Sequence, residues 1–65
     1  MQNYIVMQSR GGNSFMIAAF IERSDAMKFA ENQDGGGSYT FEVVEIPCND
    51  TWENLENLAL GRLTQ

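Results

Sequence analysis

The chain has 65 residues, a net charge of −5, one cysteine (Cys48) and no histidine. These counts exclude an intramolecular disulfide and leave no histidine for a zinc site or a catalytic base. So short a chain forms one domain, residues 1–65, that buries only about 60% of its unfolded surface. The lone cysteine, the absence of a signal-peptide pattern and the short longest apolar run, Phe15 to Ile21, predict a cytoplasmic protein without a membrane partner.

The charge is concentrated in the second half of the chain. No lysine or arginine lies between Phe29 and Gly61, whereas this segment contains Glu31, Asp34, Glu42, Glu45, Asp50, Glu53 and Glu56. The negative electrostatic field of this segment disfavours direct contact with nucleic acid and favours a basic partner. The alternative that these acids only keep a small domain soluble stays open.

The first elements in chain order are two strands. Residues 4–8 and 15–22 are rich in β-branched and aromatic side chains, and the turn formers of residues 10–14 join them, which predicts an antiparallel hairpin. In the second strand, alternation divides the residues between the two faces of the sheet. One face receives Phe15, Ile17, Ala19 and Ile21, and the opposite face receives Met16, Ala18 and Phe20. Both faces are apolar, so one covers the core and the other meets a second helix or forms a contact surface.

A helix is predicted to follow, with Ser24 accepting a hydrogen bond at its first turn and Asp25 at the positive end of its dipole. Ala26, Phe29 and Ala30 have the spacing of a core-facing stripe, and we expect the helix to end near Gln33. The three glycines that come next, residues 35–37, follow a helix and precede a strand. A phosphate-binding loop has the reverse context and a lysine, so we interpret these glycines as structural slack.

Residues 39–46 predict the third strand, because Tyr39, Phe41 and Val43 alternate with polar residues. The alternation then slips at Val44, which indicates either a bulge near residues 43–44 or burial on both faces. Pro47 ends the strand.

The last element is a helix that opens with a capping box, Asp50 at the N-cap and Glu53 at N3. Its apolar stripe comprises Trp52, Leu55, Ala59 and Leu63, and Gly61 either caps the helix or lies inside it. The predicted fold is therefore α+β with the order β-β-α-β-α. One helix packs on a three-stranded antiparallel sheet, and the C-terminal helix covers the other face or projects.

No catalytic, cofactor-binding or metal-binding residue is predicted. Cys48 has acidic and no basic neighbours in sequence, which disfavours a reactive thiolate. Glu42 and Glu45 fall on opposite faces of a regular strand, Glu53 and Glu56 have no pocket beside them, and no calcium-loop pattern occurs. We therefore expect a protein that is not an enzyme and that needs no cofactor.

The stretch from Tyr4 to Pro47, YIVMQSRGGNSFMIAAFIERSDAMKFAENQDGGGSYTFEVVEIP, resembles small host-inhibitor proteins of bacteriophages. Their pattern is a hairpin, a helix of the type (S/T)-x-D/E-A-x-x-x-A-E and a strand of the type F-E-V-x-x-(I/V)-x-P. The RNA polymerase inhibitor of T7-type phages and compact anti-defence proteins look like this. The resemblance implies a viral protein that binds and inhibits a host macromolecule, and it transfers no binding residue.

The leading functional prediction is an inhibitor of a host enzyme or defence complex that acts by protein–protein contact, with mimicry of a nucleic-acid backbone as its sharper form. The predicted contact residues are Glu42, Glu45, Glu53 and Glu56, with Trp52 as the apolar anchor. The alternative that Trp52 is the lid of the small core stays open. Two alternatives stay open. One is a homodimer or larger homo-oligomer with a structural or assembly role, and the other is a small-ligand binder, for example of nucleotides, built at an oligomer interface.

Overall fold

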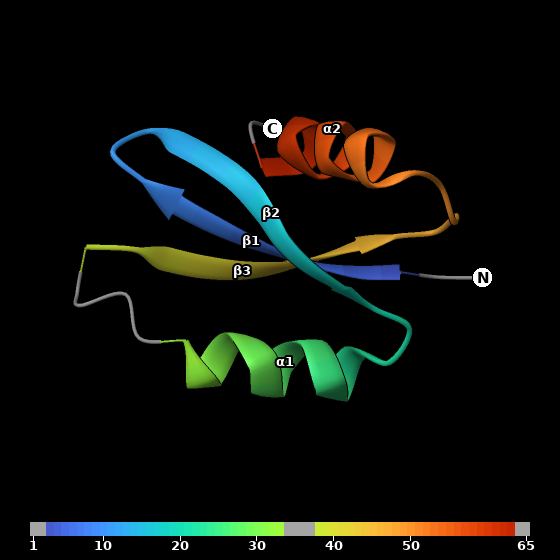
Figure 1. Ribbon diagram of the computed structural model, residues 1–65, viewed down its shortest axis with the longest axis horizontal. Coiled ribbons are helices and arrows are strands. Elements are labelled where there is room, and N and C mark those ends of the chain that lie inside the picture. Colours follow the sequence, from blue (N-terminus) through green and yellow to red (C-terminus); the bar gives the residue numbers. More distant parts are fainter. Residues whose placement is uncertain (1–2, 34–37, 64–65) are drawn as a thin grey trace.

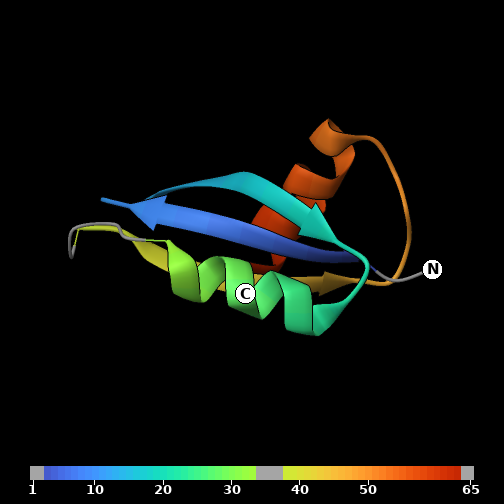
Figure 2. The ribbon, with the colours of Figure 1, turned by 60° about the horizontal axis from the view of Figure 1, so that its bottom comes forward.

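The computed structural model describes residues 3–33 and 38–63, which form a sheet between two helices. The elements are β1 (Asn3–Arg10), β2 (Asn13–Phe20), α1 (Arg23–Asn32), β3 (Thr40–Ile46) and α2 (Trp52–Leu63). β1 lies between β2 and β3 and pairs antiparallel with both. The two helices lie on opposite sides of the sheet (Figures 1 and 2). The predicted α+β class and the element order are confirmed, and α2 covers the second sheet face instead of projecting.

A two-residue turn joins β1 to β2. Gly11 and Gly12 have φ angles of 58° and 86°, and Arg10 pairs with Asn13 across the turn. Positive φ at both central positions is the requirement of a type I′ hairpin turn, whose twist matches that of the flanking strands. Because the turn is this tight, the strands extend two residues further toward it on each side than the sequence indicates.

β2 contains the irregularity of the sheet. Val6 pairs with Ala18 and Met7 with Met16, so Ile17 has no partner on β1 and forms a bulge. Phe15 and Ala18 therefore lie on the same side of the sheet, and Met16 lies on the other. The predicted grouping of Phe15 with the odd-numbered residues after it is wrong, because one extra residue inverts the alternation along the strand.

β3, in contrast, pairs with β1 in an unbroken register from Asn3–Ile46 to Ser9–Thr40. There is no bulge at residues 43–44. The apolar residues after Phe41 reflect burial on both faces, since Val44 and Ile46 are buried on the α2 side and Val43 is half-buried on the α1 side.

The core has two parts, one on each face of the sheet. The larger part lies under α2 and comprises Ile5, Met7, Met16, Val44, Ile46, Leu55 and Ala59, with Leu60 and Leu63 packed against it. On the α1 side Val6 and Ala26 are fully buried, and the rings of Phe20 and Phe29 lie 5.4 Å apart between centroids. Two small cores explain why the strands are apolar on both faces.

Both helices begin at other residues than their sequence signals predict. α1 starts at Arg23, and Glu22 occupies its N-cap position without a side-chain cap bond, so Ser24 lies within the first turn and does not cap. β2 ends at Phe20, two residues before the predicted end, and the chain turns into the helix correspondingly early. The predicted end of α1 is confirmed, with Gln33 as the C-cap.

α2 starts at Trp52, which makes Thr51 the N-cap residue. The Oγ1 atom of Thr51 accepts a hydrogen bond from the amide of Asn54 at 3.3 Å, whereas the predicted box paired Asp50 with Glu53. A threonine can cap a helix as an aspartate does, and Thr51, not Asp50, directly precedes the first helical residue. Gly61 lies inside the helix and does not cap it.

The glycine triplet of residues 35–37 lies outside the described residues. Among the helices that the structure does describe, none has the length and apolar character needed to cross a membrane.

Candidate functional site

The predicted contact residues are distributed over both sides of the molecule. Glu42 pairs with Met7 and so lies on the α2 side of β3, whereas Glu45 pairs with Tyr4 and lies on the α1 side. Both glutamates are exposed. The expectation that they point to opposite faces is confirmed, and it means that these two carboxylates reach a common partner only along the edge of β3.

Glu56 differs from the other acidic residues of this set. Its side chain is half-buried, and its Oε2 atom accepts a hydrogen bond of 2.8 Å from the backbone amide of Met16. Met16 lies beside the bulge of β2, where the strand ladder is interrupted. Because a partly buried amide without an acceptor is costly, this carboxylate satisfies the Met16 amide and ties α2 to β2. It already has a structural partner.

Trp52 and Glu53 are both exposed in the first turn of α2, and Trp52 has 52% of its surface accessible. Trp52 is therefore not part of the buried core, and the alternative that it forms the lid of that core is wrong. Leu55 and Ala59 carry the packing of this helix instead.

Asp50, just before α2, has a local role. Its Oδ1 atom accepts hydrogen bonds from the side-chain amide of Asn54 at 2.9 Å and from the backbone amide of Thr51 at 2.8 Å. These two bonds, the one from Asn54 foremost, lower the pKa of Asp50 below its ordinary value of 3.8. The bonds fix the approach to the helix and leave Asp50 ionised at neutral pH.

A groove of about 480 Å³ lies between α1 and β3. We call it the α1–β3 groove, and it is lined by Arg23, Met27, Ala30, Glu31, Phe41 and Val43. Its β-strand residues come from β3 alone, so it lies along the outer side of the sheet. Met27 is 42% exposed, and Phe41 and Val43 are half-buried. The floor is apolar, and one basic and one acidic side chain flank it.

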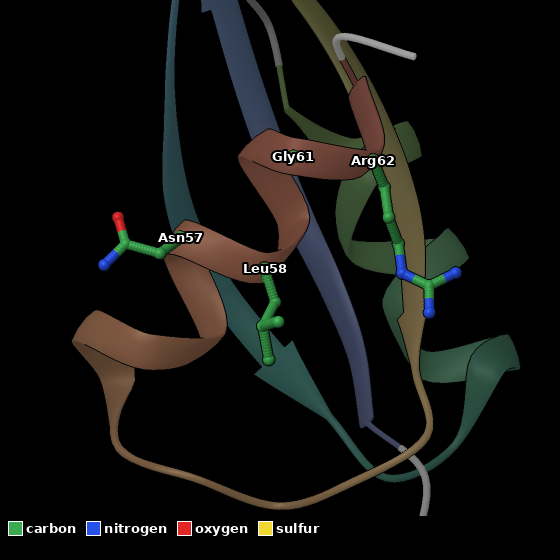
Figure 3. Close-up of a pocket in the computed structure, with 4 residues that line it drawn as sticks. All are labelled: Asn57, Leu58, Gly61 and Arg62. Atoms are coloured by element: carbon green, nitrogen blue, oxygen red, sulfur yellow. The ribbon is translucent and has the colours of Figure 1, made fainter.

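A second hollow, of about 420 Å³, lies on the outward side of α2. Asn57, Leu58, Gly61 and Arg62 line it, and the polar ends of Asn57 and Arg62 point away from one another (Figure 3). A small-molecule site brings several polar groups to bear on one ligand within a concave pocket. This hollow has no such convergence, and we assign it no ligand.

Two further polar contacts were not foreseen. The Nδ2 atom of Asn3, the buried polar residue of the described core, donates to the carbonyl of Cys48 at 2.9 Å and to Oδ1 of Asn49 at 3.1 Å. The guanidinium of Arg10 donates to the hydroxyl of Tyr39 at 3.0 Å and lies 5.2 Å from the centre of its ring. Neither pair is marked by sequence spacing, because the partners are 29 or more residues apart.

Neither a known protein family, nor a curated protein, nor a solved structure matches the chain. In residues 3–33 and 38–63 no group of three or more cysteine, aspartate or glutamate side chains is arranged to hold a metal ion. The site is thus defined by surface features alone: the exposed glutamates, the α1–β3 groove and Trp52.

Proposed function

We propose that this chain is a non-catalytic acidic binding protein of the phage-inhibitor type, which binds a basic surface of a host protein or complex and blocks it. The observation that carries the proposal is the exposure of Glu42, Glu45 and Glu53 in a segment without a lysine or arginine. Complementary charge accelerates encounter with a basic partner.

Trp52 supplies the second component of the proposed interface. Interfaces obtain most of their affinity from a few large anchor side chains, among which tryptophan is enriched. A tryptophan with about half of its surface in water, next to an exposed glutamate in the same helical turn, suits this role. In this scheme the glutamates govern association and Trp52 slows dissociation.

The test is capture of partners from a bacterial lysate with the tagged full chain, followed by identification of the captured proteins. Trp52→Ala is expected to lose the partner while its circular dichroism spectrum stays that of the parent chain. Leu58→Ala is the matched control, because Leu58 is a similarly exposed apolar residue of α2. If Trp52→Ala folds and retains every partner, the anchor assignment is wrong.

The dependence of capture on salt tests the electrostatic half of the proposal. Exposed charges are screened over about 10 Å at 0.1 M salt, so binding through the glutamates weakens as salt rises. Nucleic-acid mimicry requires a steep loss between about 0.05 and 0.5 M salt. Binding that does not respond to salt would rule out mimicry.

A further inference from the structure

The two edges of the sheet differ in a way that bears on binding. β1 is central, so β2 and β3 each have one edge without a neighbouring strand. Such an edge presents backbone amide and carbonyl groups that can pair with another chain, and proteins usually blunt it by bulges, charges or coverage.

The edge of β2 is blunted. The bulge at Ile17 interrupts its ladder, and the carboxylate of Glu56 occupies the amide of Met16. β3, in contrast, is regular over its seven residues. Within the described residues no backbone hydrogen bond links β3 to a segment other than β1. β3 is therefore the edge that can accept a further strand.

The α1–β3 groove lies where the side chains of such a strand would go. A strand added beside β3 points alternate side chains toward α1, next to Phe41 and Val43. The groove offers them the apolar side chains of Met27 and Ala30. On the other face α2 covers Val44 and Ile46 of β3, and Glu42 stays exposed.

The charges of β3 specify what kind of strand fits. Glu42 and Glu45 lie on opposite faces, so a strand with basic residues opposite both meets one carboxylate on each face. A second copy of this chain fits poorly, because it would bring the glutamates of two β3 strands together and each chain carries a net charge of −5.

We infer that the free edge of β3 binds an extended basic segment of the partner protein as an additional β-strand, with apolar side chains of that segment in the α1–β3 groove. This deepens the proposed function and rests on it. Backbone hydrogen bonds provide the affinity in this mode of recognition, and side-chain pockets provide the specificity.

The probe is a capped seven-residue peptide, Thr-Arg-Thr-Val-Lys-Val-Thr, titrated into the 15N-labelled full chain. Paired antiparallel, it sets arginine opposite Glu45, lysine opposite Glu42 and the valines opposite Val43 and Phe41. Saturable changes of amide chemical shift are expected in β3 and at Met27 and Ala30. Changes centred on α2 or β2, or no change at about millimolar peptide, would overturn the inference.

Two control peptides separate strand pairing from attraction between charges. In the first, glutamate replaces both basic residues, and binding is expected to weaken about tenfold, as it does when the two charges of β3 are reversed. In the second, the central valine and the adjacent lysine carry N-methyl groups. Adjacent amides in a strand point to opposite edges, so one methyl group must face β3 and block a hydrogen bond. If the methylated peptide binds as well as the parent, the edge of β3 is not used as a strand.

The variant Glu42→Lys/Glu45→Lys is expected to weaken peptide binding about tenfold, which corresponds to about 1.4 kcal/mol for two partly screened charge pairs. Glu22→Lys, at an exposed position before α1, should change it by less than about twofold. If β3 amide shifts depend on protein concentration without peptide, a second copy occupies the edge and the choice of partner is wrong.

The same double variant in the lysate capture distinguishes the two proposals. Peptide binding at β3 without any captured partner leaves the edge assignment standing and contradicts the proposed function. A partner captured by the parent chain and lost by the double variant, together with the absence of peptide binding, supports the proposed function and contradicts the role of β3 as a strand-pairing edge.

Discussion

Side chains of the same residue type have different roles in this protein. Glu42, Glu45, Glu53 and Glu56 look equivalent in the sequence, yet Glu56 accepts a backbone amide of β2 while the other three are exposed. A carboxylate that accepts a backbone hydrogen bond inside the fold is constrained by folding, whereas exposed carboxylates can contact a partner. The structure thus divides one acidic set into two kinds of residue.

At the residue scale, the bonds at Asp50 predict a titration. Its carboxyl should have a pKa below 3.8, and Asn54→Ala should raise that pKa toward 3.8 because the side-chain bond from Asn54 is the larger cause. The measurement is carboxyl 13C NMR against pH. Asn57→Ala, an exposed asparagine of the same helix, is the control and should leave the pKa of Asp50 unchanged.

The sign of the coupling to stability follows from this shift. Since the folded pKa lies below the unfolded one, ionised Asp50 favours the folded chain above pH about 4, and this contribution is lost as the pH falls through the folded value. A parent chain whose Asp50 titrates at or above 3.8 would contradict the bonds described.

At the element scale, the sheet depends on α2 for more than apolar cover. The backbone amide of Met16, beside the bulge of β2, donates to the carboxylate of Glu56. This hydrogen bond links α2 to β2 between residues that are 40 positions apart in the sequence. The bulge and the carboxylate also blunt the β2 edge, which leaves β3 as the open one.

Glu56→Ala is expected to lower the free energy of unfolding by about 2 kcal/mol, because it removes a bond to a charged acceptor and leaves a partly buried amide unpaired. Glu56→Gln keeps an acceptor and should cost less. Glu53→Ala, on the exposed part of the same helix, should change stability by less than about 0.5 kcal/mol. Urea unfolding measures all three, and equal effects of Glu56→Ala and Glu53→Ala would contradict the assigned role.

At the scale of the whole molecule, the second helix changes the expectation of self-association. The apolar second face of the sheet suggested a homodimer, but α2 covers that face through Leu55 and Ala59. Large apolar side chains that remain exposed, such as Met27 and Trp52, lie on helices at opposite sides of the sheet.

We therefore predict a monomer in sedimentation velocity at micromolar concentration and moderate salt. Trp52→Ala should sediment as the parent chain does, because we propose that Trp52 contacts a host protein and not a second copy of this chain. A sedimentation coefficient that rises with protein concentration would contradict this prediction and favour the homo-oligomeric alternative.

The sequence by itself determined the local features of this protein. Alternation of apolar residues, the paired glycines of the hairpin and the apolar stripe of α2 predicted the element order and the α+β class, because these signals arise from neighbours along the chain. The same reasoning placed Glu42 and Glu45 on opposite faces, since β3 is regular. It failed where one residue alters the local count, as at the bulge of Ile17 and the caps of both helices.

Only the tertiary structure decided how these elements share their surfaces. That α2 covers the second face, that Glu56 is a structural acceptor and that Trp52 stays in water follow from contacts between residues far apart in the chain. The α1–β3 groove and the open edge of β3 likewise exist only once β1 lies at the centre of the sheet. Strand order and helix docking result from the burial of all apolar faces at once, a condition that no local pattern contains.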